Sequence, residues 1–214
     1  MSNDTFGLDV VQAAELKYAW ERNGGNNADI KSLSSGDMVA QILPILRGYG
    51  KVVVSLLQNL GEVAFPGVTN FVASEKFIQN TSPEVAVKIS GFGSNFSNWF
   101  LGKTETNVAP SRIGYGKLIQ RAKDAVIIAF LGGDSKAETS LAEIFHLTSL
   151  QPNGEAGVLL NNGWANIFYV CDKDDVLRRV FVDWIAGGWY FFADPTTDEF
   201  EWFDGRRVFS RKVA

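Results

Sequence analysis

The chain of 214 residues has one histidine and one cysteine, and this restricts its catalytic chemistry. His146 stands alone, so a metal site or mechanism that needs two histidines is excluded. Its apolar neighbours predict a partly buried histidine with a backbone hydrogen-bond partner. Cys171 cannot form an intramolecular disulfide, and the charge of Asp172 beside it should raise the pKa of the thiol. Catalysis by either residue is not expected.

Three glycine-containing segments could bind phosphate, but none has a complete motif. Gly91–Gly93 lacks the third glycine of a dinucleotide-binding loop. Gly102–Lys103 and Gly116–Lys117 lack the earlier glycine of a P-loop. The sequence therefore predicts no nucleotide and no other cofactor.

Acidic side chains offer two further kinds of chemistry. A predicted hairpin turn carries Asp172, Asp174 and Asp175, whose oxygen ligands could hold a calcium ion weakly; ordinary turn hydrogen bonding is the alternative. Asp183 and Glu201 could form the carboxylate pair of a hydrolase. Such an enzyme would also use arginines, namely Arg178 and Arg206.

Aromatic residues are concentrated between Trp164 and Phe209. Neighbours in a strand face opposite ways, so Trp189 and Phe191 should share one face while Tyr190 shares the other with Phe192. A second layer could cover one face, or that face could bind a sugar or lipid. A second aromatic group lies in the predicted loop after Gly91 and suits a membrane interface. The candidate lipid- or ligand-binding residues are Phe96, Trp99, Phe100, Trp184, Trp189, Tyr190 and Trp202.

Composition and charge favour a folded protein that does not bind nucleic acid. The net charge is −4 and the isoelectric point is about 5.1, which argues against a surface that neutralises phosphates. The chain starts without a recognisable signal peptide, and Val52–Ala73 is too polar for a transmembrane helix. We expect a protein made in soluble form that is cytoplasmic or released by a non-classical route.

Hydrophobic periodicity predicts helices in the first part of the chain. Leu8–Trp20 has a helical apolar pattern that should end at Asn23–Asn27. A second helical stretch should open at Ser35 or Asp37 and run to about Leu60. Pro44 and the segment Gly48–Gly50 should interrupt this stretch, giving a helix pair.

The pattern changes to that of strands after residue 83. Glu84–Ile89 alternates in polarity and predicts a strand, and a loop should follow at 91–98. Tyr115–Gln120 and Ala125–Leu131 are also expected to be strands, the second buried on both faces. Leu141–Leu150 predicts one helix that interrupts the sheet.

Short runs separated by turn residues predict an antiparallel meander over Gly157–Lys212. Its tight turns should include Asn162–Gly163, Gly187–Gly188 and Asp204–Gly205, with Trp184 and Trp189 facing each other across the second. The expected fold is α+β, a single domain over 1–214 that is mainly helical in 1–80 and mainly β in 84–214. Its N-terminal helices should pack on an antiparallel β-meander or sandwich.

Two segments resemble known proteins. EVAVKISGFGSNFSNWFLGKTETNVAPSRIGYGK, residues Glu84–Lys117, resembles the actinoporin-type cytolysins, which implies a β-sandwich whose amphipathic N-terminal helix enters a lipid bilayer. The chain lacks that family's tyrosine-rich headgroup cluster and Arg-Gly-Asp, so no binding residue carries over. WIAGGWYFFADPTTDEFEWFDGRRVFSR, residues Trp184–Arg211, resembles uncharacterised bacterial proteins of no assigned function.

These observations support three functional hypotheses. The first is a non-enzymatic membrane- or lipid-binding protein, with cytolysin-like pore formation as its strongest form. The second is a carbohydrate- or protein-binding module that uses an aromatic sheet face, and the third is the carboxylate-dependent hydrolase. The expected partners are membrane lipid or glycan, with homo-oligomerisation open and nucleic acid excluded.

Overall fold

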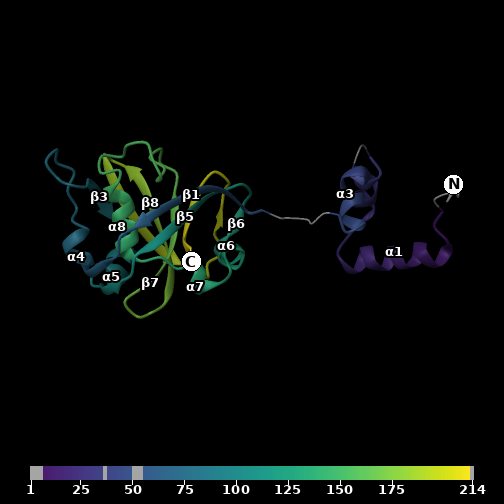
Figure 1. The fold of residues 1–214 in the computed structure, drawn as a ribbon, viewed down its shortest axis with the longest axis horizontal. Helices are drawn as coiled ribbons and strands as arrows, with labels where there is room; N and C mark the ends of the chain where they lie inside the picture. The colour runs from purple at the N-terminus through teal and green to yellow at the C-terminus, as the bar shows by residue number, and fades with distance from the viewer. Residues whose placement is uncertain (1–6, 36–37, 50–54, 213–214) are drawn as a thin grey trace. The chain divides into compact units, whose positions relative to one another are not determined.

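The computed structural model describes residues 7–35, 38–49 and 55–212. Its internal contacts divide the chain into two compact units, Met1–Val54 and Ser55–Ala214, which we call the N-terminal unit and the sheet unit. Helices and a large, mostly antiparallel sheet place the chain in the α+β class, as the sequence predicts (Figure 1).

The described part of the N-terminal unit is helical. α1 (Val10–Arg22) begins at Asp9, whose side chain accepts a hydrogen bond from the Gln12 amide, and it ends at Asn23 as predicted. α2 (Asn27–Leu33) was not expected. The asparagine run was interpreted only as a turn, whereas Asn26 caps a new helix by accepting from two amides.

The last helix of this unit, α3 (Met38–Leu46), continues through Pro44. The predicted break at Pro44 is wrong. Proline removes a single amide donor, and here it stands only two residues before the helix ends. The end at Leu46 agrees with the interruption expected at Gly48, while the expected cap Asp37 and Gly50 lie outside the described residues.

The sheet unit is built on seven strands in the order β1-β5-β11-β7-β8-β9-β3 (Figure 1). They are β1 (Leu57–Phe65), β3 (Ile89–Phe92), β5 (Ser111–Leu118), β7 (Asn166–Cys171), β8 (Leu177–Ile185), β9 (Gly188–Pro195) and β11 (Arg207–Lys212). Two small sheets accompany it, in which β2 (Val68–Val72) pairs with β4 (Thr104–Val108), and β6 (Ala122–Lys123) pairs with β10 (Glu201–Trp202). The helices of this unit are α4 (Ala73–Lys76), α5 (Ser94–Phe100), α6 (Asp124–Leu131), α7 (Asp134–Ala137) and α8 (Leu141–Ser149).

The predicted meander, which should run from a strand at Val158–Leu160 to one at Arg206–Lys212, is correct for its three middle strands and wrong for its first and last. β7, β8 and β9 are consecutive antiparallel neighbours, and Trp184 lies opposite Trp189 as expected. β11 instead lies between β5 and β7, and it is parallel to β7. This central position buries both Val208 and Phe209, on opposite faces, which an edge strand would not do. Val158–Leu160 is not a strand.

Three other expected elements differ from the structure. Residues 57–72, expected within the helical part, form β1 and β2. Ala125–Leu131, expected to be a strand, belongs to α6, because an apolar run this short fits a half-buried helix equally well. The strand expected over Glu84–Ile89 begins only at Ile89 as β3. The predicted strand at Tyr115 and the helix after Leu141 are confirmed by β5 and α8.

Two hydrophobic clusters lie on opposite faces of the seven-stranded sheet. The inner face carries Val180, Val182 and Phe191 and packs against α5 and α8. The outer face carries Ile167 and Phe181 and packs in part against α6 and α7. Because α6 and α7 contact the outer face mainly near β7 and β11, the side chains on β8 and β9 determine what the rest of this face can bind.

Candidate functional site

Aromatic rings line the outer face over β8 and β9. Tyr190 and Phe192 are half-buried there, while Trp189 and Phe191 are buried on the inner face, so the predicted alternation is confirmed. Phe192 stacks on Phe181 with ring centroids 4.7 Å apart and lies 4.4 Å from the Tyr190 ring. Phe192 therefore lies between Phe181 and Tyr190, and the three half-buried rings form one apolar group on the outer face.

Asp183 lies beside these rings and has an unsatisfied carboxylate oxygen. It is the cross-strand neighbour of Tyr190, and its Oδ1 atom is buried without a hydrogen-bond partner among the described residues. Burial raises the pKa of Asp183 to about 6, although the positive charge of Arg206 opposes the shift. A buried acceptor without a donor costs free energy.

A chain of arginine–aromatic contacts extends from this point. The guanidinium of Arg206 lies 4.7 Å from the Trp164 ring centroid and 5.2 Å from that of Phe203, and Arg121 lies 4.1 Å from the same Phe203 ring. We call these four residues the arginine–aromatic ladder. The Trp164 ring fits against Gly205, where a Cβ atom would come within 2.0 Å of the ring. Trp164 and Phe203 are each 44% exposed, so both rings can receive a ligand.

A cavity of about 410 Å³ adjoins the ladder at Trp164. Lys117 and Arg207 contribute positive charge to its lining, and Asp204 contributes one negative charge. The guanidinium of Arg207 donates to the backbone carbonyls of Gly157 and Val158 rather than to a carboxylate. The cavity therefore carries a net positive charge.

A buried ionic network supports the other end of the outer face. Arg179 is 3% exposed and bonds to Asp124 at 2.6 Å, and to Asp194 and Asp198 at 2.9 Å each. Asp124 also accepts from Trp202 Nε1 at 2.8 Å. Trp202, predicted as a ligand-binding residue, is thus a buried part of this network.

The second predicted aromatic group is not an exposed tip. Phe96 and Phe100 are fully buried in α5, because residues four apart share one side of a helix and here that side faces the core. Trp99 is half-buried, with the Arg178 guanidinium 4.3 Å from its ring centroid. The expectation of a membrane-facing loop at these residues is wrong.

The remaining predicted aromatic residues pack mainly against the core. Trp189 is buried, and its ring contacts the half-buried Trp184 edge-on at 5.1 Å on the inner face. Tyr190 hydrogen-bonds through its hydroxyl to the Phe92 carbonyl at 2.9 Å. Tyr190 is therefore the one member of the predicted set that is partly exposed on the outer face.

The acidic turn does not assemble a metal site. Asp172 is buried and accepts from the amides of Asp174 and Val176 and from Arg178 Nε, at 2.8, 3.0 and 2.8 Å. Burial opposes ionisation, but these hydrogen bonds outweigh it and hold the pKa of Asp172 below its usual range. Nowhere in the described residues do three metal-ligating side chains cluster, so Asp175 and its neighbours form an ordinary turn.

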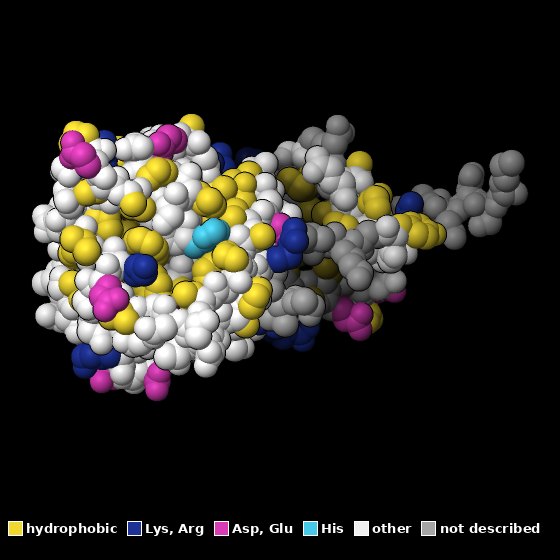
Figure 2. Space-filling view, turned by 60° about the vertical axis from the view of Figure 1, so that its left-hand side comes forward, with side chains coloured by type: hydrophobic (Ala, Val, Ile, Leu, Met, Phe, Trp, Pro, Cys, Tyr) yellow, Lys and Arg dark blue, Asp and Glu magenta, His cyan; other side chains and the backbone are white. Residues whose placement is uncertain are grey.

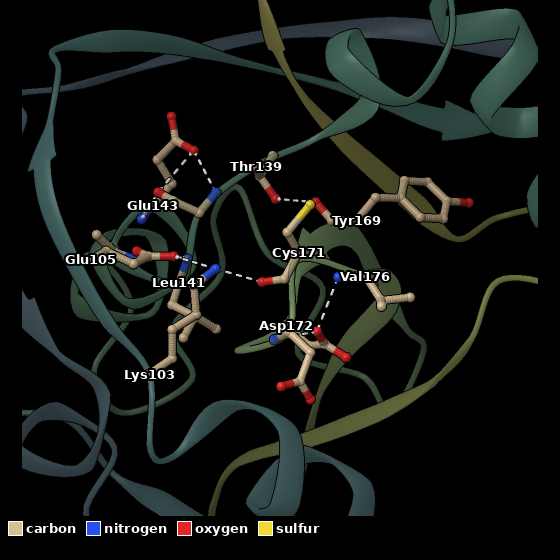
Figure 3. Close-up of polar contacts among 12 residues, drawn as sticks. Lys103, Glu105, Thr139, Leu141, Glu143, Tyr169, Cys171, Asp172 and Val176 are labelled. Atoms are coloured by element: carbon tan, nitrogen blue, oxygen red, sulfur yellow. Dashed lines mark hydrogen bonds and ion pairs between the residues drawn. The ribbon is translucent and has the colours of Figure 1, made fainter.

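A polar cluster joins α8 to the sheet (Figure 3). Glu105 accepts from the amides of Leu141 and Ala142, both at 3.0 Å, at the first turn of α8. Glu143 accepts from the Ser140 amide and bonds to Arg211 Nη2 at 2.9 Å. These carboxylates cap the helix and fix it in place, which is a structural role.

Cys171 lies in the same cluster, and the pKa of its thiol is raised as predicted, for a different reason (Figure 3). Burial raises the pKa of its thiol to about 11, and the negative charge of Glu138 adds to this effect. The sequence argument named Asp172 instead of Glu138. A thiol this weakly acidic supplies almost no thiolate near neutral pH.

His146 agrees with its predicted role. Its Nε2 atom lies 3.1 Å from the Ala64 carbonyl oxygen, and the ring is partly exposed among apolar side chains (Figure 2). The set proposed for a hydrolase is brought together only in part. Arg178 is paired with Asp172, and the exposed Glu201 acts on Lys123, whereas Asp183 is under the influence of Arg206.

No protein-family model, curated protein or solved structure matches this chain. Within the described residues, the helices are too short or too polar to cross a membrane.

Proposed function

We propose that this chain is a non-enzymatic carbohydrate-binding protein whose site is the outer face around Asp183. The observation that carries the proposal is the buried, unpartnered oxygen of Asp183 beside a surface of half-buried rings. A pyranose presents hydroxyl donors at its edge and C–H groups on its face. The donors would bind the partly exposed Asp183 carboxylate, while the apolar face would pack against the exposed part of the Tyr190 ring.

Replacing Asp183 by asparagine tests this proposal through two readouts that should move in opposite directions. We expect Asp183→Asn to lose binding on a glycan array, because the ionised acceptor is gone. We also expect it to stabilise the protein at neutral pH by about 1–2 kcal/mol, after allowing for partial exposure of the carboxylate. A residue that costs stability but is needed for binding has a functional role.

The raised pKa of Asp183 predicts how the stability of the protein changes with pH. Asp183 has a pKa near 6 in the folded protein, above the usual aspartate value, so folding takes up a proton between about pH 4 and 6. The stability advantage of Asp183→Asn should therefore shrink as pH falls through this window. Asp134→Asn, an exposed aspartate at the start of α7, is the matched control. Unchanged glycan binding by Asp183→Asn would place the site elsewhere.

A second candidate function, lipid binding, is favoured by a different observation. None of the described helices of the N-terminal unit contains a buried residue. Val11 and Tyr18, seven positions apart and so on one side of α1, are 66% and 65% exposed. Exposed apolar side chains in a helix suit insertion at a membrane interface, although α1 lacks the lysine- and arginine-rich polar face typical of such helices.

Liposome sedimentation of the full chain tests lipid binding. Neutral phosphatidylcholine vesicles should bind the wild type, and Tyr18→Asp should reduce binding by about tenfold because a carboxylate resists transfer to the interface. Ser32→Asp adds the same charge at an exposed position of α2 and should have little effect. Equal binding by the two variants, or none by the wild type, contradicts this candidate.

A further inference from the structure

We infer that the carbohydrate ligand is acidic, and that Arg121 and Arg206, which Phe203 holds in place, recognise its carboxylate while the exposed part of the Trp164 ring packs against a sugar ring. This inference rests on the proposed function and names the ligand class of the same outer face. It extends the site from Asp183 along the arginine–aromatic ladder to the cavity at Trp164.

The arginines of the sheet unit differ in whether they form an ion pair with a carboxylate. Arg112, Arg178, Arg179 and Arg211 each form an ion pair with a carboxylate. Among the described residues, Arg121 and Arg206 of the ladder form none within 4 Å. Arg207 also forms none, but it lies over the Tyr115 ring on the inner face, at the far side of the adjoining cavity. Unpaired guanidinium groups gathered in one place predict an anionic ligand.

Aromatic contacts already hold the guanidinium groups of Arg121 and Arg206 in position. Stacking against Phe203 restricts the Arg121 guanidinium, and Arg206 is held by two rings and by a 3.2 Å hydrogen bond to the Asp204 carbonyl. An arginine held in this way loses less side-chain freedom when it binds a carboxylate through two parallel hydrogen bonds. Lys117, which lines the cavity, adds a further positive charge.

The carboxylate of Asp183 favours an acidic saccharide over a nucleic acid as the ligand. Asp183 can accept hydrogen bonds from sugar hydroxyls but not from an ionised phosphate group, which has no donor. An acidic sugar supplies hydroxyl donors for Asp183, a carboxylate for the arginines and ring faces for Trp164. It satisfies all three kinds of group at once.

The experiment compares matched ligands that differ only in charge or in one acidic sugar. Isothermal titration of the full chain would use tetragalacturonate against its methyl ester, and sialyllactose against lactose. We expect the acidic member of at least one pair to bind about tenfold more tightly at low salt, with the difference shrinking as salt rises.

Variants test whether the arginine–aromatic ladder causes the tighter binding of the acidic ligand. Arg206→Gln and Arg121→Gln should each reduce the preference for the acidic ligand by about fivefold or more. Trp164→Ala should weaken both ligands. Arg47→Gln, an exposed arginine of the N-terminal unit, removes the same charge and should change neither. Thermal unfolding of each variant checks that the fold is kept.

The outcomes separate this inference from the proposed function. Equal binding of acidic and neutral ligands overturns the inference and leaves the carbohydrate site in place. Absence of binding to any glycan, on the array or by titration, overturns both. Tighter binding of a single-stranded oligonucleotide than of either acidic saccharide overturns the inference and identifies phosphate as the anion recognised by the arginines.

Discussion

Gly188→Val is expected to lower the free energy of unfolding by more than about 4 kcal/mol, because its side chain would collide with backbone. A Cβ atom at Gly188 would lie 2.6 Å from the Ser90 amide nitrogen and 3.0 Å from the Ile89 carbonyl carbon. Both atoms belong to β3, whose backbone is tied to β9 by a parallel ladder and by a bond from the Ser90 hydroxyl to the Gly188 carbonyl. Relieving the clash means separating β3 from the sheet.

Chemical denaturation followed by tryptophan fluorescence measures this effect, since Trp189 directly follows the mutated residue. Gly102→Val is the matched control: nothing lies within 4 Å of a Cβ atom there, and its φ is not in the left-handed region. It should cost less than about 1 kcal/mol. If the two variants unfold at similar denaturant concentrations, β3 does not pack on Gly188 as the structure has it.

The β8–β9 hairpin at Gly188 shows which structural features can be predicted from the sequence. Alternating residues and a glycine pair correctly predict β8 and β9, the tight turn and the Trp184–Trp189 contact. The turn itself is displaced by one residue. Its central residues are Ala186 and Gly187, with φ of 52° and 75°, and Gly188 already lies in β9. Gly188 is needed because β3 approaches closely, a contact between distant segments that local patterns do not contain.

The difference between local sequence patterns and contacts between distant segments also explains which other helices and strands could be predicted. Helices with a full cap and a long apolar period, such as α1 and α8, are predictable from local sequence. α6 is not, since a short apolar run has no period that separates a buried strand from a helix. The insertion of β11 between β5 and β7 depends on which strands lack a partner, and this is a property of the whole sheet.

The candidate site was predictable in part. Strand alternation placed Tyr190 and Phe192 on one face, and Asp183 was already named for its charge. The ladder was missed because Arg121 lies in a segment far from Trp164 and Phe203 in sequence. The available signal was Gly205, whose lack of a side chain leaves room for the Trp164 ring beside Arg206. The exposed tip at Phe96 was wrong because a short helix was interpreted as a loop.

Asp124→Ala is expected to lower the free energy of unfolding by about 3–5 kcal/mol, because it removes an acceptor from three buried donors. The Asp124 carboxylate is fully buried and accepts from Arg179 Nη1 at 2.6 Å, and from Tyr169 Oη and Trp202 Nε1 at 2.8 Å each. Arg179 would keep Asp194 and Asp198, whose side chains are 36% and 35% exposed and therefore partly hydrated. Asp134→Ala, at an exposed position in α7, should cost well under 1 kcal/mol.

A double variant shows how much of the stability lost in Asp124→Ala comes from the Arg179 guanidinium. Replacing a whole buried ion pair by apolar groups costs less than removing one partner, so Asp124→Leu with Arg179→Met should be more stable than Asp124→Ala alone. The two exposed aspartates can then be hydrated, while Tyr169 and Trp202 remain without their acceptor. Denaturation of the three variants gives the comparison. Recovery by the double variant assigns the loss to the buried Arg179 guanidinium left without the Asp124 carboxylate. An equal loss in both assigns it to the two orphaned donors, and Asp124→Ala as stable as Asp134→Ala would contradict the network itself.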